Sequence, residues 1–155
     1  MISKLGTHCR FLNGGTPSKA NAAFFDGHIP WITSADIAGP VADSARSFIT
    51  EEAIKSSAAN LVPAGTVLLV TRTGVGKVAR TGTELSFSQD ITAVIHDSET
   101  IDADYLVQYL RSQQKYFVGQ ARGATIKGIT RDVVASLDVR LPPLPEQRRI
   151  AAILD

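Results

Sequence analysis

Runs of apolar residues predict where the chain forms buried strands. Residues 66–71 and 91–95 are β-branched or continuously apolar, and turn or polar residues bound both runs. Such runs are typical of strands covered on both faces of a sheet. Shorter strands are predicted over residues 29–33, with Pro30 near the start or on an edge, and over residues 137–141. The pattern therefore predicts a sheet at the centre of the fold.

Helical spacing appears between and after these strands. From Asp102, a candidate N-cap, apolar residues recur on one helix face, which predicts the best-formed helix, ending before Gly119. Short helices are predicted over residues 51–57 and 131–136, each preceded by a threonine that can serve as N-cap. Residues 119–128 are polar and contain glycine, so we expect a loop there.

A proline-rich segment, residues 142–145, separates the last predicted strand from a final helix. Pro145 suits the first turn of a helix over residues 146–155. A helix this short is marginal by itself in water, so its apolar side is expected to begin a coiled-coil seam with a partner helix. The candidate residues of this partner-helix interface are Ile150, Ile153 and Leu154.

These elements predict an α/β (α+β) fold, with a twisted, mixed or mainly antiparallel sheet and short flanking helices. We expect one folded domain over residues 1–141, then a hinge and the first turns of a helix over residues 142–155. A paired-glycine segment, residues 14–18, is predicted as a loop in which glycine permits positive φ. Trp31 is predicted to anchor the core.

Composition places the chain among ordinary globular proteins. Its 155 residues are 44% hydrophobic, and 16 basic residues against 15 acidic ones give a formal net charge of +1. Cys9 is the single cysteine, so no internal disulfide can form. No apolar run is long enough for a membrane span, and the first residues lack the pattern of a signal peptide, so a cytoplasmic location is expected.

Charge is unevenly distributed along the chain. Residues 111–131 hold five basic residues and no acidic one, and Arg72, Lys77 and Arg80 form a second basic group. Residues 81–104 hold six acidic residues and no Lys or Arg. Charge runs are often only solvated surfaces, but two basic loops facing a polyanion produce the same pattern. Charge alone leaves both interpretations open.

The sequence lacks the motifs of common enzymes. Gly74-Val75-Gly76-Lys77 follows a strand as a phosphate-binding loop does, but Thr71 stands where a Walker loop needs glycine, and Val78 where it needs Ser or Thr. The three histidines are scattered, and no serine lies in a Gly-x-Ser-x-Gly turn. We therefore expect a non-catalytic chain that binds no metal or cofactor of its own.

Short motifs follow one another along nearly the whole chain. They lie at residues 12–18, 27–32, 62–68, 71–77, 88–90, 123–125 and 141–151. Each motif by itself is weak, but their ordered set resembles the target recognition domains of type I restriction-modification specificity subunits, and the run from Leu141 to Ala151 is the most specific.

The resemblance implies a domain that reads one half of a split sequence in double-stranded DNA. It also implies partner subunits for modification (methyltransferase) and restriction, with S-adenosylmethionine and ATP bound on those subunits, and it allows a second specificity half-subunit. A full subunit of this family would carry two such domains joined by two long antiparallel helices.

The residues themselves suggest how DNA would be held. Glycines in the 72–77 loop let backbone N–H groups approach phosphates, and Arg72 and Lys77 can add charge-assisted contacts. Base edges require side chains with directional donors and acceptors. The candidate DNA-binding residues are Lys19, Thr33, Ser34, Arg72, Thr73, Gly74, Lys77, Arg122, Thr125 and Lys127.

Other functions remain open from the sequence. The chain can be mainly an assembly module, whose last helix recruits methyltransferase or a second half-subunit while DNA affinity arises only in the complex. It can also be a recognition domain separated from a fused restriction-methyltransferase enzyme. An independent enzyme is the last alternative.

Overall fold

The computed structural model describes residues 2–123 and 128–154, built around a five-stranded sheet. Its strand order is β2–β10–β7–β8–β4, and neighbours are antiparallel except for β4 and β8. All of β7 and the first four residues of β10 are buried, as the apolar runs predicted. The strands are β2 (Cys9–Asn13), β4 (Val41–Ala42), β7 (Val67–Val70), β8 (Val78–Thr81) and β10 (Ile91–His96).

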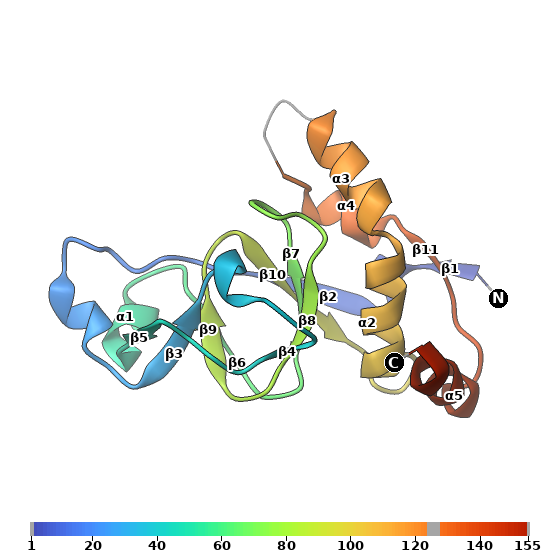
Figure 1. Cartoon of the computed structure of the whole chain (residues 1–155), viewed down its shortest axis with the longest axis horizontal. Helices are drawn as coiled ribbons and strands as arrows, with labels where there is room; N and C mark the ends of the chain where they lie inside the picture. The colour runs from blue at the N-terminus through green and yellow to red at the C-terminus, as the bar shows by residue number, and fades with distance from the viewer. Residues whose placement is uncertain (1, 124–127, 155) are drawn as a thin grey trace.

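Two smaller sheets extend the molecule on either side (Figure 1). In the four-stranded sheet, ordered β5–β3–β9–β6, β3 is parallel to β9 and the other pairs are antiparallel. Pro30 is the second residue of β3, before its pairing with β9 begins at Trp31. These strands are β3 (Ile29–Ile32), β5 (Ser47–Ile49), β6 (Leu61–Val62) and β9 (Leu85–Phe87), and the third sheet pairs β1 (Ile2–Lys4) with β11 (Asp138–Arg140).

Three of the predicted N-caps are present. The side chains of Thr50, Asp102 and Thr130 each accept a hydrogen bond from the backbone N–H three residues later. They begin helices α1 (Glu51–Lys55), α2 (Ala103–Ser112) and α4 (Arg131–Ala135). Single 3-10 turns lie at η1 (Leu5–Thr7), η2 (Ala22–Phe25) and η3 (Ser34–Asp36).

The helix from Asp102 ends before Gly119, as predicted, but the first residues of the loop predicted over 119–128 are helical. After a break at Gln113, the chain continues as helix α3 (Gln114–Arg122), which includes Gly119. A glycine in a helix interior costs only about 1 kcal/mol relative to alanine. The fully buried Phe117 secures the helix to the core, so the packing of this one side chain outweighs the local cost.

The core lies on both faces of the central sheet. Leu69 and Val94 pack with Leu106, Leu110 and Phe117 beneath α2 and α3. On the other face, a second cluster includes Ile32, Leu68, Phe87 and Ile91. Trp31 is 5% exposed and its Nε1 donates to the carbonyl oxygen of Gly15 at 3.0 Å, so it is the predicted anchor. The arrangement confirms the α+β class with mixed, mainly antiparallel sheets.

The last helix, α5 (Leu144–Leu154), has Pro145 in its first turn, as predicted. It packs against α2 (Figure 1), and Gln147 and Ala151 are its buried residues. Of the predicted partner-helix residues, Ile150 is half-buried, whereas Ile153 is 81% exposed and Leu154 is 60% exposed. No helix in the described part of the chain is long and apolar enough to cross a membrane.

The reactivity of the buried Cys9 thiol tests how closely the core is packed around it. Burial, and then the negative charge of Asp97, raise the pKa of its thiol to about 12, so the thiol stays protonated at pH 8. We expect the native protein to react slowly with a thiol reagent such as Ellman's reagent and the urea-unfolded protein to react at once, followed by absorbance. Rapid stoichiometric reaction of the native protein at pH 8 would contradict this packing.

Candidate nucleic-acid interface

The loop between β7 and β8, residues 72–77, is closed at its base and exposed at its tip. Val70 and Lys77 pair through a 2.9 Å backbone hydrogen bond, and Gly76 N–H donates to the carbonyl of Val70 at 2.9 Å. Thr73 has φ 51°, and Gly74 and Gly76 have φ near 96° and 98°. Glycine adopts these angles without cost, but a β-branched residue does not, so Thr73 stores strain of about 1 kcal/mol or more.

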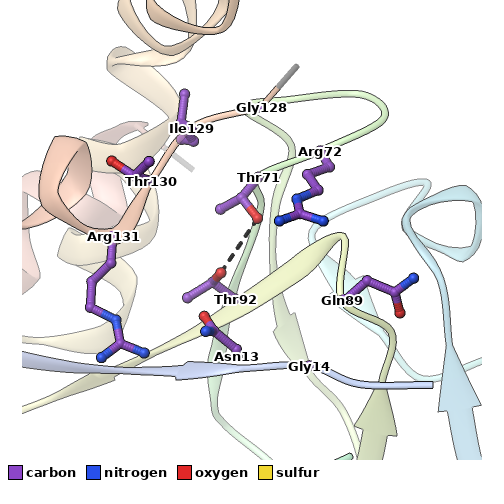
Figure 2. Close-up of a pocket in the computed structure, with 10 residues that line it drawn as sticks. All are labelled: Asn13, Gly14, Thr71, Arg72, Gln89, Thr92, Gly128, Ile129, Thr130 and Arg131. Atoms are coloured by element: carbon purple, nitrogen blue, oxygen red, sulfur yellow. Dashed lines mark hydrogen bonds between the residues drawn. The ribbon is translucent and has the colours of Figure 1, made fainter. Parts of the chain in front are cut away.

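One arm of this loop borders a hollow of about 500 Å³, hereafter the Arg72 hollow (Figure 2). The hydroxyls of Thr71 and Thr92 lie 3.4 Å apart inside it, and the guanidinium groups of Arg72 and Arg131 point toward it. No acidic residue is among its described lining residues. Those residues are Asn13, Gly14, Thr71, Arg72, Gln89, Thr92, Gly128, Ile129, Thr130 and Arg131.

Close backbone contacts hold the walls of the Arg72 hollow together. Ile129 N–H donates to the carbonyl of Thr71 at 2.9 Å, and a Cβ on Gly128 would lie 2.8 Å from that same oxygen. Gly14 lies against the backbone of Ser88, with no room for a side chain. The predicted loop over residues 14–18 is present, but neither Gly14 nor Gly15 adopts the positive φ that glycine permits. The pair serves close approach of chain segments instead.

The other arm of the loop borders a second hollow of about 750 Å³, hereafter the Lys77 hollow. Lys77 Nζ donates to the carbonyl of Ser34 at 3.4 Å, and Arg111 Nη2 to that of Val78 at 3.5 Å. This hollow too has no acidic residue among its described lining residues. They are Ala35, Ile37, Ala38, Gly39, Pro40, Gly76, Lys77, Val78, Arg111 and Gln114.

The structure brings some of the predicted residues together and separates others. Arg72, Thr73, Gly74 and Lys77 share the 72–77 loop, and all four are exposed. Lys19 is exposed in the segment between β2 and η2, and lines neither hollow.

Arg122 is exposed at the end of α3 and also lines neither hollow. The candidates Thr125 and Lys127 lie outside the described residues. Arg80, counted in the second basic group of the sequence, forms an ion pair with Asp104 at 2.6 Å. Its charge is therefore partly neutralised within the protein.

Ser34 does not fit the role of a base-reading residue. It is 3% exposed, and its backbone N–H donates to Asp90 Oδ2 at 3.2 Å, so it serves the scaffold. Thr33 is half-buried, and its hydroxyl lies 3.4 Å from both Asp36 Oδ2 and Arg46 Nη2. In the sequence, Thr33 and Ser34 look like exposed loop residues because they are short, polar and follow a strand. Only the fold shows that η3 directs them toward the protein interior.

Several polar residues of the hollows were missed from the sequence, among them Asn13, Gln89, Arg111 and Arg131. Gln89 is exposed, and its Oε1 accepts a hydrogen bond from the hydroxyl of Thr16, which fixes the amide. Gln89 and Asn13 belonged to short motifs that could have drawn attention to them. Arg111 and Arg131 lay in the basic run but had no local signal that placed them beside the 72–77 loop.

Neither hollow has the composition of a metal centre. Within residues 2–123 and 128–154, no three His, Cys, Asp or Glu residues lie together as a metal would require. Guanidinium, ammonium, amide and hydroxyl groups supply the polar chemistry instead. Such groups bind anions and form directional hydrogen bonds with base edges.

Comparison with known proteins identifies the class to which this fold and surface belong. The chain belongs to the type I restriction modification DNA specificity domain family, whose model matches residues 1–155. This confirms the resemblance seen in the motifs, and assigns the chain to DNA specificity rather than to catalysis.

Individual relatives agree with the family. The chain is 33% identical over 158 residues to the specificity subunit of the Escherichia coli type I restriction enzyme EcoR124I/EcoR124II, covering 97% of the chain and 39% of that protein. It is 28% identical over 147 residues to the MjaIX specificity subunit of Methanocaldococcus jannaschii, covering 91% and 34%. The chain thus spans less than half the length of these curated relatives.

A solved structure shows the same fold. The HsdS subunit from Thermoanaerobacter tengcongensis matches all of this chain, and 36% of its own, with a TM-score of 0.77 at 22% identity. The mixed sheets and short helices are therefore an architecture that the chain shares with this crystal structure.

Proposed function

We propose that this chain reads a DNA sequence for a type I restriction-modification complex, and that it binds duplex DNA on the surface formed by the 72–77 loop and its two hollows. The observation that carries the proposal is the Arg72 hollow, where Arg72 and Arg131 meet amide and hydroxyl groups without an acidic lining residue among those described. A near-neutral chain attracts a polyanion through such local concentration of charge.

The chemistry of the surface supports two kinds of contact. Arginine binds phosphate in a bidentate manner and fixes the position of the protein on DNA without reading sequence. The amides of Asn13 and Gln89 can donate and accept at base edges, as amide side chains do with adenine. The Arg72 hollow thus supplies groups for both tasks.

The same proposal includes the partners of the complex. The DNA-bound domain would position the modification and restriction subunits on DNA, and S-adenosylmethionine and ATP would bind on those subunits. Ile153 and Leu154 of α5 are exposed apolar residues suited to packing against a helix of a partner or of a second half-subunit. Because the substrate is cellular DNA, we place the activity in the cytoplasm.

The test is selection of a randomised duplex library by the chain, with and without the modification subunit, at two salt concentrations. We expect one short motif to be enriched by the chain alone, with affinity falling as salt rises, because phosphate contacts release counterions. Enrichment only with the partner would favour the assembly role, which the exposed end of α5 supports. Absence of enrichment in both cases would overturn the proposal.

A further inference from the structure

Helix α2 contacts the chain on both sides of the proline segment, residues 142–145 (Figure 1). On one side, two tyrosine side chains of α2 donate hydrogen bonds to strand β11. On the other side, helix α5 packs against α2, and its Gln147 side chain accepts from the backbone at the start of α2. One helix therefore holds both the strand that leads into the segment and the helix that follows it.

The carbonyl groups that the two tyrosines bind belong to the outer edge of β11. In an antiparallel pair, opposite residues alternate between those that exchange backbone hydrogen bonds and those whose backbone groups point away. Leu5 N–H donates to the carbonyl of Leu137 at 2.8 Å, which makes these two residues a bonded pair. By the register of β1 and β11, the carbonyls of Asp138 and Arg140 then point away from β1.

The spacing of the tyrosines on α2 matches the spacing of these carbonyls on β11. The hydroxyl of Tyr105 donates to the carbonyl of Arg140 at 2.8 Å, and that of Tyr109 donates to the carbonyl of Asp138 at 2.6 Å. Residues four apart on a helix are separated by about 6 Å along its axis, and residues two apart on a strand by about 7 Å. Helix α2 thus supplies side-chain donors to the outer edge of β11, where a neighbouring strand would supply backbone donors.

Both hydrogen bonds lie beside the core. Val139 of β11 is 1% exposed, and the side chains of Tyr105 and Tyr109 are half-buried. Burial, and then the negative charges of Asp138 and of an ionised Tyr105, raise the pKa of Tyr109 to about 12. Its hydroxyl therefore stays protonated, and able to donate, at pH 8.

The path from β11 to α5 contains few bonds that can rotate freely. Leu141, Pro142 and Pro143 are the only residues between the two elements, and a proline ring fixes φ near −65°. The carbonyl of Pro142 accepts from Gln147 Nε2 at 2.8 Å, and that of Pro143 accepts from the backbone N–H of Glu146 at 2.9 Å. A strand that is fixed against α2 therefore leaves little freedom in the direction of the helix that follows.

We infer that Tyr105 and Tyr109 are positioning residues, which together with Gln147 make the proline segment a rigid joint and hold α5 in one direction relative to the rest of the domain. The sequence predicts a hinge at this segment, and a hinge would let α5 swing. Through a rigid joint, a partner that packs on the exposed Ile153 and Leu154 is held at a fixed position relative to the DNA surface. That consequence rests on the proposed function.

The test measures the distance between two nitroxide labels on the whole chain by pulsed electron paramagnetic resonance. One label is placed on α5 with Arg149→Cys and the other on α1 with Lys55→Cys, both at exposed positions, and Cys9→Ala removes the native thiol. We expect one narrow distance peak for this labelled parent. Tyr105→Phe with Tyr109→Phe keeps both rings but removes the two donors to β11, so a broad distribution should replace the narrow peak.

The matched control is Tyr116→Phe, which removes the hydroxyl of an exposed tyrosine on α3 and should keep the narrow peak. A further variant adds Gln147→Leu to the two tyrosine substitutions, which also removes the hydrogen bonds of α5 to the start of α2, and it should broaden the distribution more. Thermal melting checks that every variant folds. A merely structural role of the tyrosines would lower the melting temperature and leave the distance distribution of the folded protein narrow.

A broad distribution in the labelled parent would show a hinge and overturn the inference. A narrow peak in the double tyrosine variant, or broadening that appears only after Gln147→Leu is added, would also overturn it, because the tyrosines would then not set the direction of α5.

Binding of duplex DNA separates this inference from the proposed function. The affinity of the double tyrosine variant should stay within about twofold of the parent, since neither tyrosine lines the Arg72 hollow or the Lys77 hollow. A larger loss would show that the tyrosines act on the domain itself and not on the joint, against the inference. Failure of the parent to bind duplex DNA would count against the proposed function alone, because the distance measurement needs no DNA.

Discussion

Gly14→Ala is expected to destabilise the protein by about 4 kcal/mol or more, a large fraction of the stability of about 5–15 kcal/mol that is usual for folded domains. A Cβ at this position would overlap the carbonyl oxygen of Ser88 and lie 2.6 Å from both the carbonyl oxygen and the ring of Phe87. Backbone atoms cannot move aside as a flexible side chain can. Phe87 is fully buried in the core between the sheets, so a shift there would disturb packing well beyond the loop.

Gly39→Ala is the matched control, because a Cβ there would meet no described atom within 4 Å. Urea denaturation of both variants, followed by circular dichroism, measures the difference. We expect the control to stay within about 0.5 kcal/mol of the parent protein. A Gly14→Ala protein as stable as the control would show that the two chain segments are not held in this close approach.

Strands and helix starts were predictable because their causes are local. The apolar run of β7 requires burial on both faces, whichever segments provide the cover. Thr50, Asp102 and Thr130 supply cap oxygens to N–H groups only three residues away. By contrast, residues 119–122 belong to α3 rather than to the predicted loop, because Phe117 secures that helix to a core formed by distant residues.

The candidate site was predictable only in part, because only some of its residues are close together in the sequence. The 72–77 loop was recognisable from its glycines and charges, which are adjacent in sequence. The two hollows are formed by residues from β2, the β9–β10 turn, α2 and α4, which only tertiary packing assembles. Sequence position also overstated the candidate Ser34, which is buried, and the second basic group, in which the charge of Arg80 is paired with Asp104.

Charge pairing inside the protein explains how a chain of net charge +1 presents a basic surface. Arg46 and Arg80 are exposed enough to reach solvent but bind Asp36 and Asp104. Arg72, Lys77 and Arg131 instead line hollows that have no acidic residue among their described lining residues. The fold therefore separates cations used internally from cations that face outward, which the total charge conceals.

The position of α5 depends on one buried amide. Gln147 is 0% exposed, and its Oε1 accepts from the backbone N–H of Asp102 at 2.9 Å. Its Nε2 donates to the carbonyl oxygens of Thr100 at 2.9 Å and Pro142 at 2.8 Å. One side chain thus joins the start of α2, the preceding turn and the proline segment, and it satisfies three backbone groups.

Gln147→Leu is expected to destabilise the protein by about 3 kcal/mol, since three partly buried backbone groups would each lose a partner at about 1 kcal/mol. Urea denaturation measures this loss. Arg149→Leu, at an exposed position of the same helix, is the control and should change stability by less than about 0.5 kcal/mol. Equal stability of the two variants would mean that the amide does not secure α5.

Gln147→Glu separates hydrogen bonding from side-chain volume through its dependence on pH. The introduced carboxylate can still accept from Asp102 N–H but would face the carbonyl oxygens of Thr100 and Pro142, so burial and these dipoles should raise its pKa above the unfolded value of about 4.3. A raised folded pKa means that the protonated form is the stable one. The variant should therefore recover part of its lost stability as pH falls through the folded pKa toward the unfolded one, and lose it again as pH rises.

Urea unfolding of the variant and the parent protein, measured from pH 4.5 to pH 8, tests this prediction. We expect the difference between their free energies of unfolding to become smaller in acid. A stability difference between variant and parent protein that does not change with pH would indicate that α5 has moved away and left the carboxylate in water. In that case the three hydrogen bonds of Gln147 determine where α5 docks, and do not only add to its stability.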